Sequence, residues 1–226
     1  MNIVVDHKKQ FLSIFNETAR YHHRHKVFRD FITLASVSIH NNILFDERLE
    51  QEYMETVCQY EAEDTERMAR LLAEVVMGLE AGSCDFLGSL YMSLELGESA
   101  RGQFFTPFCI SRMMAEMQLG ELDRMLKEKP FVTVYEPACG SAGMLLAIAE
   151  VVREKGFNPT RHLWVSCTDI DPVASGMAYI QLSLMGVAGE VVTGNALNGE
   201  RRTVMYTPAH WIGNWSFRLR ENELSN

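Results

Sequence analysis

The chain has 226 residues, a mass of 25.7 kDa and an ordinary globular composition, with 47% hydrophobic and 23% charged residues, which excludes disorder, collagen and long coiled coils. Its five cysteines include no Cys-x-x-Cys pair, so we predict reduced thiols in a cytoplasmic protein rather than a disulfide framework or a zinc site. The net charge is −9, and the first 100 residues carry 9 basic and 17 acidic side chains, which makes that half a poor general binder of phosphates.

The N-terminus has no basic region followed by an apolar stretch, and no apolar run approaches the ~20 residues of a membrane span. We therefore expect neither a signal peptide nor a membrane contact. Residues 8–40 and 46–80 have apolar side chains at three- and four-residue spacing, which predicts an all-helical region. The histidine-rich run 21–25 is either a metal or phosphate site or a solvated helix face or turn; the second reading is favoured because no Cys or carboxylate lies at ligand spacing.

A distinct segment precedes the next predicted helix. Gly102-Gln103-Phe104-Phe105-Thr106-Pro107 ends in Thr-Pro, which is typical of a helix start, and we expect Thr106 to cap a helix that runs to about Met117. The free N–H groups and the hydroxyl at this end are suited to holding a carboxylate.

From residue 131 the pattern alternates between strands and helices. Residues 131–135, 162–168 and 190–193 read as strands, and residues 142–155 and 173–185 as helices between them. This order predicts a parallel α/β sheet whose ligands gather at the carboxyl ends of the strands. A fourth strand is expected at 204–206 or 210–212.

Each predicted strand is followed by a candidate ligand segment. After the first strand comes Glu136-Pro137-Ala138-Cys139-Gly140-Ser141-Ala142-Gly143, whose small residues permit close backbone approach to a ligand, although many α/β proteins have such a turn. After the second, Asp169 is suited to accept ribose hydroxyls, while Asp171 before Pro172 is suited to cap a helix. After the third, Asn195 either pairs with an adenine edge or forms an ordinary turn.

Four segments in this order resemble the gamma class of N6-adenine DNA methyltransferases, especially the modification subunits of type I restriction systems. The segments are 85–96, 102–107, 136–143 and 169–172, and the resemblance covers roughly residues 85–200. It implies a partial Rossmann-like methyltransferase sheet at 101–226, short at its C-terminal end, behind a helical N-terminal domain at 1–100.

The resemblance also implies S-adenosylmethionine as the cofactor. Gln103, Phe105, Thr106 and Pro107 would wrap its methionine end, and Asp169 with Asp171 would lie at the ribose. Asn195 stands where the family usually has an acid that contacts the adenine. The loop beneath the cofactor would comprise Glu136, Ala138, Gly140, Ser141, Ala142 and Gly143.

The chain departs from the family at the catalytic segment. The family has an Asp, Asn or Ser followed by Pro-Pro and an aromatic residue, and this chain contains no Pro-Pro. The nearest candidate is Asn214-Trp215-Ser216-Phe217, with Asn214 and Phe217 as catalytic residues; the alternative is that its aromatic side chains cover the sheet.

Two functions remain open from the sequence. One is an adenine-specific DNA methyltransferase of restriction-modification type. The other is a catalytically silent homologue that binds S-adenosylmethionine and acts as a decoy or regulator of a methyltransferase complex. In either case a homodimer or a methyltransferase subunit is expected to cover the incomplete sheet, and DNA to be contacted locally or through a partner.

Overall fold

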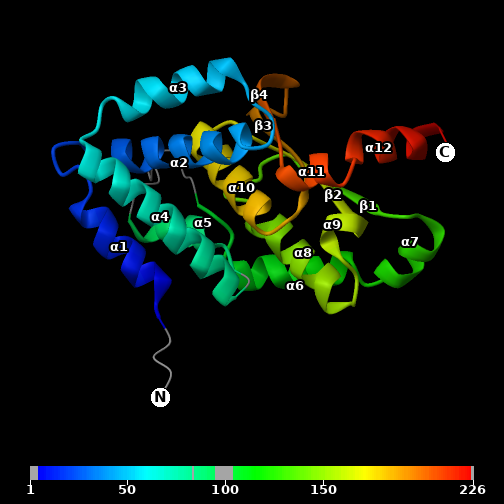
Figure 1. Ribbon diagram of the computed structural model, residues 1–226. Coiled ribbons are helices and arrows are strands. Elements are labelled where there is room, and N and C mark those ends of the chain that lie inside the picture. Colours follow the sequence, from blue (N-terminus) through cyan, green and yellow to red (C-terminus); the bar gives the residue numbers. More distant parts are fainter. Residues whose placement is uncertain (1–4, 83, 95–103, 225–226) are drawn as a thin grey trace.

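The computed structural model describes residues 5–82, 84–94 and 104–224. Its first half is helical, as predicted, and Figure 1 shows these helices grouped on one side of the molecule. They are α1 (His7–Glu17), α2 (Arg24–Asn41), α3 (Glu47–Val57), α4 (Ala62–Ala81) and α5 (Phe86–Ser93).

The stretch 8–40 is two helices rather than one. Ala19 adopts a left-handed conformation with φ of 42°, which ends α1 and turns the chain. The guanidinium of Arg24, the first residue of α2, donates to the carbonyl oxygens of Phe15, Thr18 and Ala19 at 2.7–2.8 Å. This side chain satisfies carbonyl groups at the end of α1 that have no partner within the helix.

The histidine-rich run 21–25 lies at this turn. His22 packs against Tyr21 and Tyr60, and its ring nitrogen lies 3.3 Å from the carbonyl oxygen of Gln59. No group of three His, Cys, Asp or Glu side chains within the described residues is arranged to hold a metal ion. The geometry agrees with the interpretation of this run as a turn.

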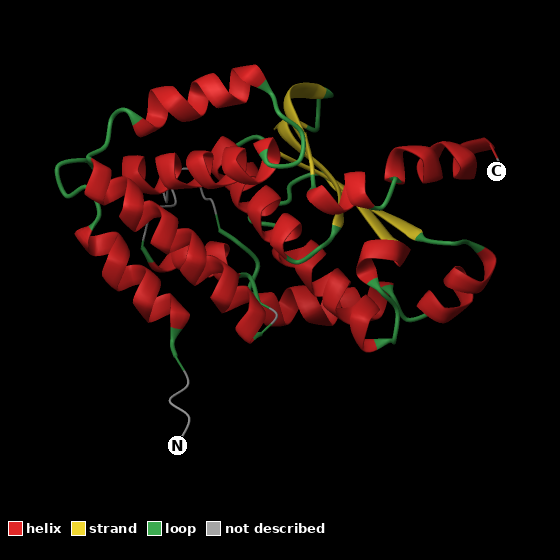
Figure 2. Cartoon of the chain, viewed as in Figure 1, coloured by secondary structure: helices red, strands yellow, loops and turns green. Residues whose placement is uncertain are grey.

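The second half contains the sheet, drawn in yellow in Figure 2. The strands are β1 (Val132–Glu136), β2 (Leu163–Asp169), β3 (Ala188–Asn195) and β4 (Glu200–Tyr206). The helices are α6 (Phe108–Gln118), α7 (Leu122–Glu128), α8 (Gly143–Glu154), α9 (Pro159–His162), α10 (Pro172–Leu184), α11 (Pro208–Ile212) and α12 (Trp215–Leu224).

The strands are ordered β1-β2-β3-β4, with β1, β2 and β3 parallel and β4 antiparallel to β3. The α/β fold is therefore confirmed, but the sheet is mixed rather than wholly parallel. The connection between β3 and β4 is too short for a crossover helix, so the chain must return as a hairpin. Residues 210–212, the second candidate for the fourth strand, are the last three residues of α11.

Helix α10 joins the two halves of the molecule. One of its faces lies in a hydrophobic core with α1, α2, α4 and α5, through Val173, Met177 and Ile180. The other contributes Ala178, Tyr179 and Leu182 to the core beneath the sheet. The division into domains at residue 100 falls in a part of the chain that the structure does not describe, and it stays a prediction. Among the described helices, none is both long and apolar enough to cross a membrane.

Candidate functional site

The loop between β1 and α8 lies against the carboxyl end of β2. Gly140 and Ala142 have positive φ values of 54° and 74°, which fold the loop tightly before the first turn of α8. The Gly140 N–H donates to Asp169 Oδ2 at 2.8 Å, and the Cys139 N–H donates to the carbonyl oxygen of Thr168 at 3.0 Å. Two segments that are 29 residues apart in the sequence therefore form one surface.

A cavity of about 250 Å³ joins this loop to the segment before α6. Phe105 lies against the loop so closely that a Cβ on Gly140 would be 2.9 Å from its ring, and Tyr91 of α5 stacks on Phe105. The cavity is lined by Asp85, Phe104, Phe105, Thr106, Ser111, Met114, Glu136, Ala138, Cys139, Gly140, Ser141, Gly143 and Met144. The segments around Thr106, Gly140 and Asp169 thus converge in space.

Helix α6 starts later than the Thr-Pro pattern predicts. The residue that precedes its first turn is Pro107, and no described side chain caps this end. Thr106 is exposed and borders the cavity instead of capping the helix. Its hydroxyl is therefore not used at the helix start. Gln103 and Gly102 of the same segment lie outside the described residues.

Asp169 is half-buried and holds two backbone N–H groups. Its Oδ2 accepts from the Gly140 N–H, and its Oδ1 accepts from the Asp171 N–H at 2.9 Å. Burial raises the pKa of Asp169, and the backbone hydrogen bonds from Asp171 and Gly140 oppose that rise. A carboxylate has about four lone-pair sites, so these two bonds leave acceptor capacity for hydroxyl groups of a ligand.

The neighbouring polar residues have local structural roles. The Asp171 side chain caps α10 by accepting from the Val173 N–H at 2.9 Å, as the Asp-Pro pattern predicts. Asn195 Oδ1 accepts from the Leu197 N–H at 3.0 Å and so forms the turn after β3. These bonds do not test whether Asp171 and Asn195 also contact a cofactor, which stays a prediction.

Two exposed apolar side chains at this end of the sheet are absent from the sequence interpretation. Ile170, directly after Asp169, is 60% exposed, and Leu197, two residues after Asn195, is 99% exposed. The sequence signal for Ile170 was an apolar residue directly after the acid at the end of the predicted strand. Exposed apolar side chains at the ends of strands are typical of surfaces that contact a ligand or a partner.

A buried polar network fixes the loop to α5 and α10. Asp85 caps α5 at the Gly88 N–H and accepts from the Ser141 hydroxyl at 2.6 Å and from Gln181 Nε2 at 2.9 Å. The Gln181 amide also donates to the Ser141 carbonyl oxygen and accepts from the Leu87 N–H. The sequence signal for Gln181 was a single amide in an otherwise apolar helix.

The proposed catalytic segment lies at the other end of the sheet. Trp215 is fully buried with Phe131, which precedes β1, and its indole N–H donates to the carbonyl oxygen of Thr160, which precedes β2. Seven residues of β2 separate this end from Asp169, which is roughly 20 Å at ~3.3 Å per residue. The structure therefore does not bring Asn214 and Phe217, both exposed, to the cavity beside Gly140.

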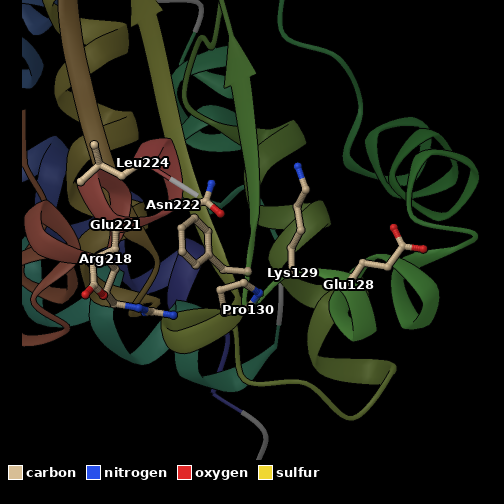
Figure 3. A pocket seen from close by; sticks show the side chains of 8 residues that line it. Glu128, Lys129, Pro130, Arg218, Glu221, Asn222 and Leu224 are labelled. Carbon is tan, nitrogen blue, oxygen red and sulfur yellow. The ribbon is translucent and has the colours of Figure 1, made fainter. Parts of the chain in front are cut away.

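A second cavity, of about 730 Å³, lies at that same amino-terminal end. Figure 3 shows it between the segment 128–131 and α12, with Lys129 and Glu128 on one side and Arg218, Glu221 and Asn222 on the other. The Arg218 guanidinium stacks on Trp215 with 3.8 Å between its carbon and the ring centre. This cavity includes none of the predicted cofactor residues.

The five cysteines are free thiols, as predicted. Cys139 borders the smaller cavity, but contact with Cys167 and burial raise its pKa, so the thiol stays protonated and unreactive. The site therefore offers backbone N–H groups, hydroxyls and carboxylates. Such groups are suited to binding and orienting a polar ligand.

The fold and the cavity define an α/β protein with a candidate ligand site at the carboxyl ends of its strands. A sequence model of the N-6 DNA methylase family matches residues 86–218, and the chain belongs to that family. No curated protein sequence matches the chain. One solved structure, assigned to the class I S-adenosylmethionine-dependent methyltransferases of Listeria monocytogenes, is 18% identical with a TM-score of 0.43, covering 81% of this chain and 51% of that one. The chain thus spans about half the length of that protein.

The cofactor of the family is S-adenosylmethionine, and the residues present fit it. Among the described residues, the buried Ser111 hydroxyl has no hydrogen-bond partner, and it belongs to a residue that borders the cavity. Glycine at 140 leaves room where a Cβ would meet Phe105. The half-buried Asp169 has acceptor capacity suited to ribose hydroxyls, and the cavity of about 250 Å³ lies beside Gly140, to which Asp169 is hydrogen-bonded.

Proposed function

We propose that this chain binds S-adenosylmethionine at the carboxyl ends of β1, β2 and β3 and takes part in methylation of adenine N6 in DNA, in a system of restriction-modification type. The observation that carries the proposal is the convergence of Thr106, Gly140 and Asp169 around one surface. Membership of the N-6 DNA methylase family supports adenine in DNA as the substrate.

In this proposal the cofactor supplies an electrophilic methyl group, and the chain binds and orients it. The methionine end lies in the cavity against Phe105, Thr106 and Pro107, together with Gln103, and above the loop residues Glu136, Ala138, Gly140, Ser141, Ala142 and Gly143. Asp169 accepts from the ribose hydroxyls, beside Asp171. Asn195 and the exposed Ile170 lie where the adenine ring would rest.

The position of Asn214 favours a second candidate function. An amide that accepts from the adenine amine has to lie near the transferred methyl group, and Asn214 is at the opposite end of β2. A chain that binds the cofactor without an acceptor of its own would act as a decoy or regulator in a methyltransferase complex. Under the first candidate, Asn214 and Phe217 remain the proposed catalytic residues, or a partner supplies the acceptor.

The edge of the sheet is the proposed partner surface. Within the described residues, β1 pairs only with β2, and its Tyr135 is 60% exposed. A methyltransferase subunit or a second copy of this chain would cover this edge. The two-domain division, at 1–100 and 101–226, and a cytoplasmic location are part of the same proposal.

Two assays separate the candidates. Titration calorimetry with S-adenosylmethionine should detect binding under both, and Asp169→Ala should weaken it by about 1–3 kcal/mol through lost hydrogen bonds. Transfer of labelled methyl groups to DNA of mixed sequence should occur only if the chain is itself an enzyme. Binding without transfer would support the regulator, and absence of binding would refute both.

A further inference from the structure

Helix α6 is apolar on two opposite sides. Ser111 and Ala115 are buried on the side that packs along α8 (Figure 1). With 3.6 residues per turn, the opposite side carries Ile110, Met113 and Met117, which are 43%, 51% and 77% exposed. A surface helix normally has polar side chains on the side away from the core, so a helix that is apolar on both sides is typical of one that is covered on both sides.

The exposed apolar side chains of α6 form a patch of the size of an interaction surface. We call Phe104, Ile110, Met113, Met114 and Met117, all of which are exposed, the outer face of α6. At ~150–250 Å² for a large side chain, their exposed fractions amount to roughly 400–700 Å². The largest apolar patch on a typical monomer is about 300–600 Å², and each partner contributes about 800 Å² to a standard interface.

The charges of α6 indicate which kind of partner fits this face. The helix has two charged side chains, Arg112 and Glu116, and Arg112 forms ion pairs with Glu116 and with Glu150 and Glu154 of α8. The outer face of α6 therefore supplies no free cation of its own. DNA and anionic membranes are bound through lysine and arginine, so an apolar protein surface fits this face better than either of them.

The outer face of α6 is also complementary to itself. Residues 104–120 contain one basic and one acidic residue, whereas the whole chain has a net charge of −9, so contact through this segment brings few like charges together. If two α6 helices run antiparallel across a two-fold axis, Ile110 lies opposite Met117 of the partner subunit and Met113 lies opposite Met114 of the partner subunit. Methionine side chains are flexible and adapt to such a contact.

We infer that the outer face of α6 binds the same face of a second copy of this chain and forms a two-fold symmetric dimer. Phe104 and Met114 belong both to this face and to the lining of the cavity beside Gly140, so the second copy borders the mouth of that cavity. The inference does not depend on which ligand the cavity binds.

The first measurement is the oligomeric state of the unaltered chain. Sedimentation velocity over about 1–100 µM, the weak end of the affinities found for interfaces of standard size, should show a monomer that converts to a dimer. A monomer at every concentration in this range would overturn the inference.

The second measurement places charges on the outer face. Met113→Lys combined with Met117→Lys should raise the Kd of the dimer at least about 100-fold, because like charges from both copies would meet in the contact. Both positions are exposed and lysine is a good helix former, so the melting temperature of the dilute monomer should not change. Lysine also reduces the net negative charge of the chain, so general repulsion would not explain the dissociation.

Met77→Lys is the matched control. Met77 is exposed on α4 at helical spacing from Glu74 and Glu80, outside any comparable apolar patch of that helix, and its replacement should leave the Kd of the dimer unchanged. Equal weakening by Met77→Lys, or a dimer that persists in the double variant, would overturn the assignment to α6.

Methionine oxidation locates the contact without a substitution. Hydrogen peroxide followed by mass spectrometry should oxidise Met117 and Met77 alike in the dilute monomer, and Met117 much more slowly in the concentrated dimer. Protection of Met117 at every concentration would mean that the chain itself covers this face. A dimer without protection would use another surface, such as the edge of β1. Either result overturns the inference.

Discussion

The role of each polar residue at the site depends on how many of its hydrogen-bonding atoms already have partners within the protein. Asp171 and Asn195 are engaged in a helix cap and a turn, and Asp169 holds two backbone N–H groups. Asp169 differs because burial raises its pKa, so its ionised form is less stable than that of an exposed acid. A ligand that donates hydrogen bonds to the carboxylate would offset this cost.

The raised pKa of Asp169 predicts a pH dependence of cofactor affinity. The pKa of Asp169 is higher in the native state than in the unfolded chain. Ionisation of Asp169 therefore destabilises the native state above the raised pKa, and this destabilisation is relieved as the pH falls through that pKa. Ribose hydroxyls need the ionised acceptor, so we expect the affinity for S-adenosylhomocysteine to fall over the same acidic range. Calorimetry at a series of pH values measures this change in affinity.

Asp169→Asn should remove this pH dependence of affinity and weaken binding at neutral pH by about tenfold or more. Asp46→Asn is the matched control, because Asp46 caps α3 away from the cavity and should leave the pH profile of binding unchanged. An Asp169→Asn variant with the same profile as the unaltered chain would assign the pH dependence to another group.

At the scale of elements, the loop between β1 and α8 is supported by helices that come before and after it in the chain. Asp85 begins α5, Ser141 lies in the loop, and Gln181 is in α10; their side chains form one buried network. A Cβ on Gly88 would lie 2.1 Å from Asp85 Oδ2 and 2.3 Å from Ser141 Oγ, so glycine is needed there. The helical half therefore helps to position the site.

This network predicts that Gln181→Met destabilises the protein by about 1–3 kcal/mol, because it leaves the Ser141 carbonyl and the Leu87 N–H without their side-chain partner. Cofactor affinity should fall as well, since the loop loses an anchor. Chemical denaturation and calorimetry measure the two effects.

Gln51→Met serves as the control for Gln181→Met. Gln51 is exposed on α3 and bonds only to Glu55 in its side-chain contacts among the described residues. Its replacement should change stability by less than about 0.5 kcal/mol. Equal effects of the two variants would show that the buried network contributes nothing of its own.

At the scale of the whole molecule, the two ends of the sheet have separate roles. The carboxyl ends of β1 and β2 hold the loop, the cavity and Asp169. The amino ends are closed by a small core of Phe131, Ala188, Ala209 and Trp215, and next to it His210 accepts from the Trp164 indole N–H at 3.1 Å. Burial lowers the pKa of His210, which keeps it neutral in this packing role.

The separation of the ends predicts how the Asn214 segment behaves. Asn214→Gly keeps the left-handed backbone, whose φ is 51°, and removes the amide; Phe217→Ala removes an exposed ring. We expect both variants to bind S-adenosylmethionine as the unaltered chain does, and, if methyl transfer is detected, an unchanged rate in both would assign the acceptor to a partner. A large loss of transfer with normal binding would instead support these residues as catalytic.

The sequence was sufficient for structural features that depend on local pattern. Small residues after a strand, an acid at the next strand end and Asp-Pro at a helix start are read from neighbours in the chain, so the loop 136–143, Asp169 and the cap at Asp171 were predictable. The family resemblance rests on the same local segments. The split of residues 8–40 was missed because it depends on Arg24 reaching back to the carbonyl groups of Phe15 and Thr18.

Tertiary structure decided what depends on distant contacts. Gln181 gains its role from helices that pack together, and no spacing in the chain signals which face it occupies. The antiparallel β4 and the burial of Trp215 direct Asn214 to the amino ends of the strands, although its position in the sequence resembles that of a catalytic residue. Sequence order sets which strand a residue follows, whereas strand direction and packing set which end of the sheet it reaches.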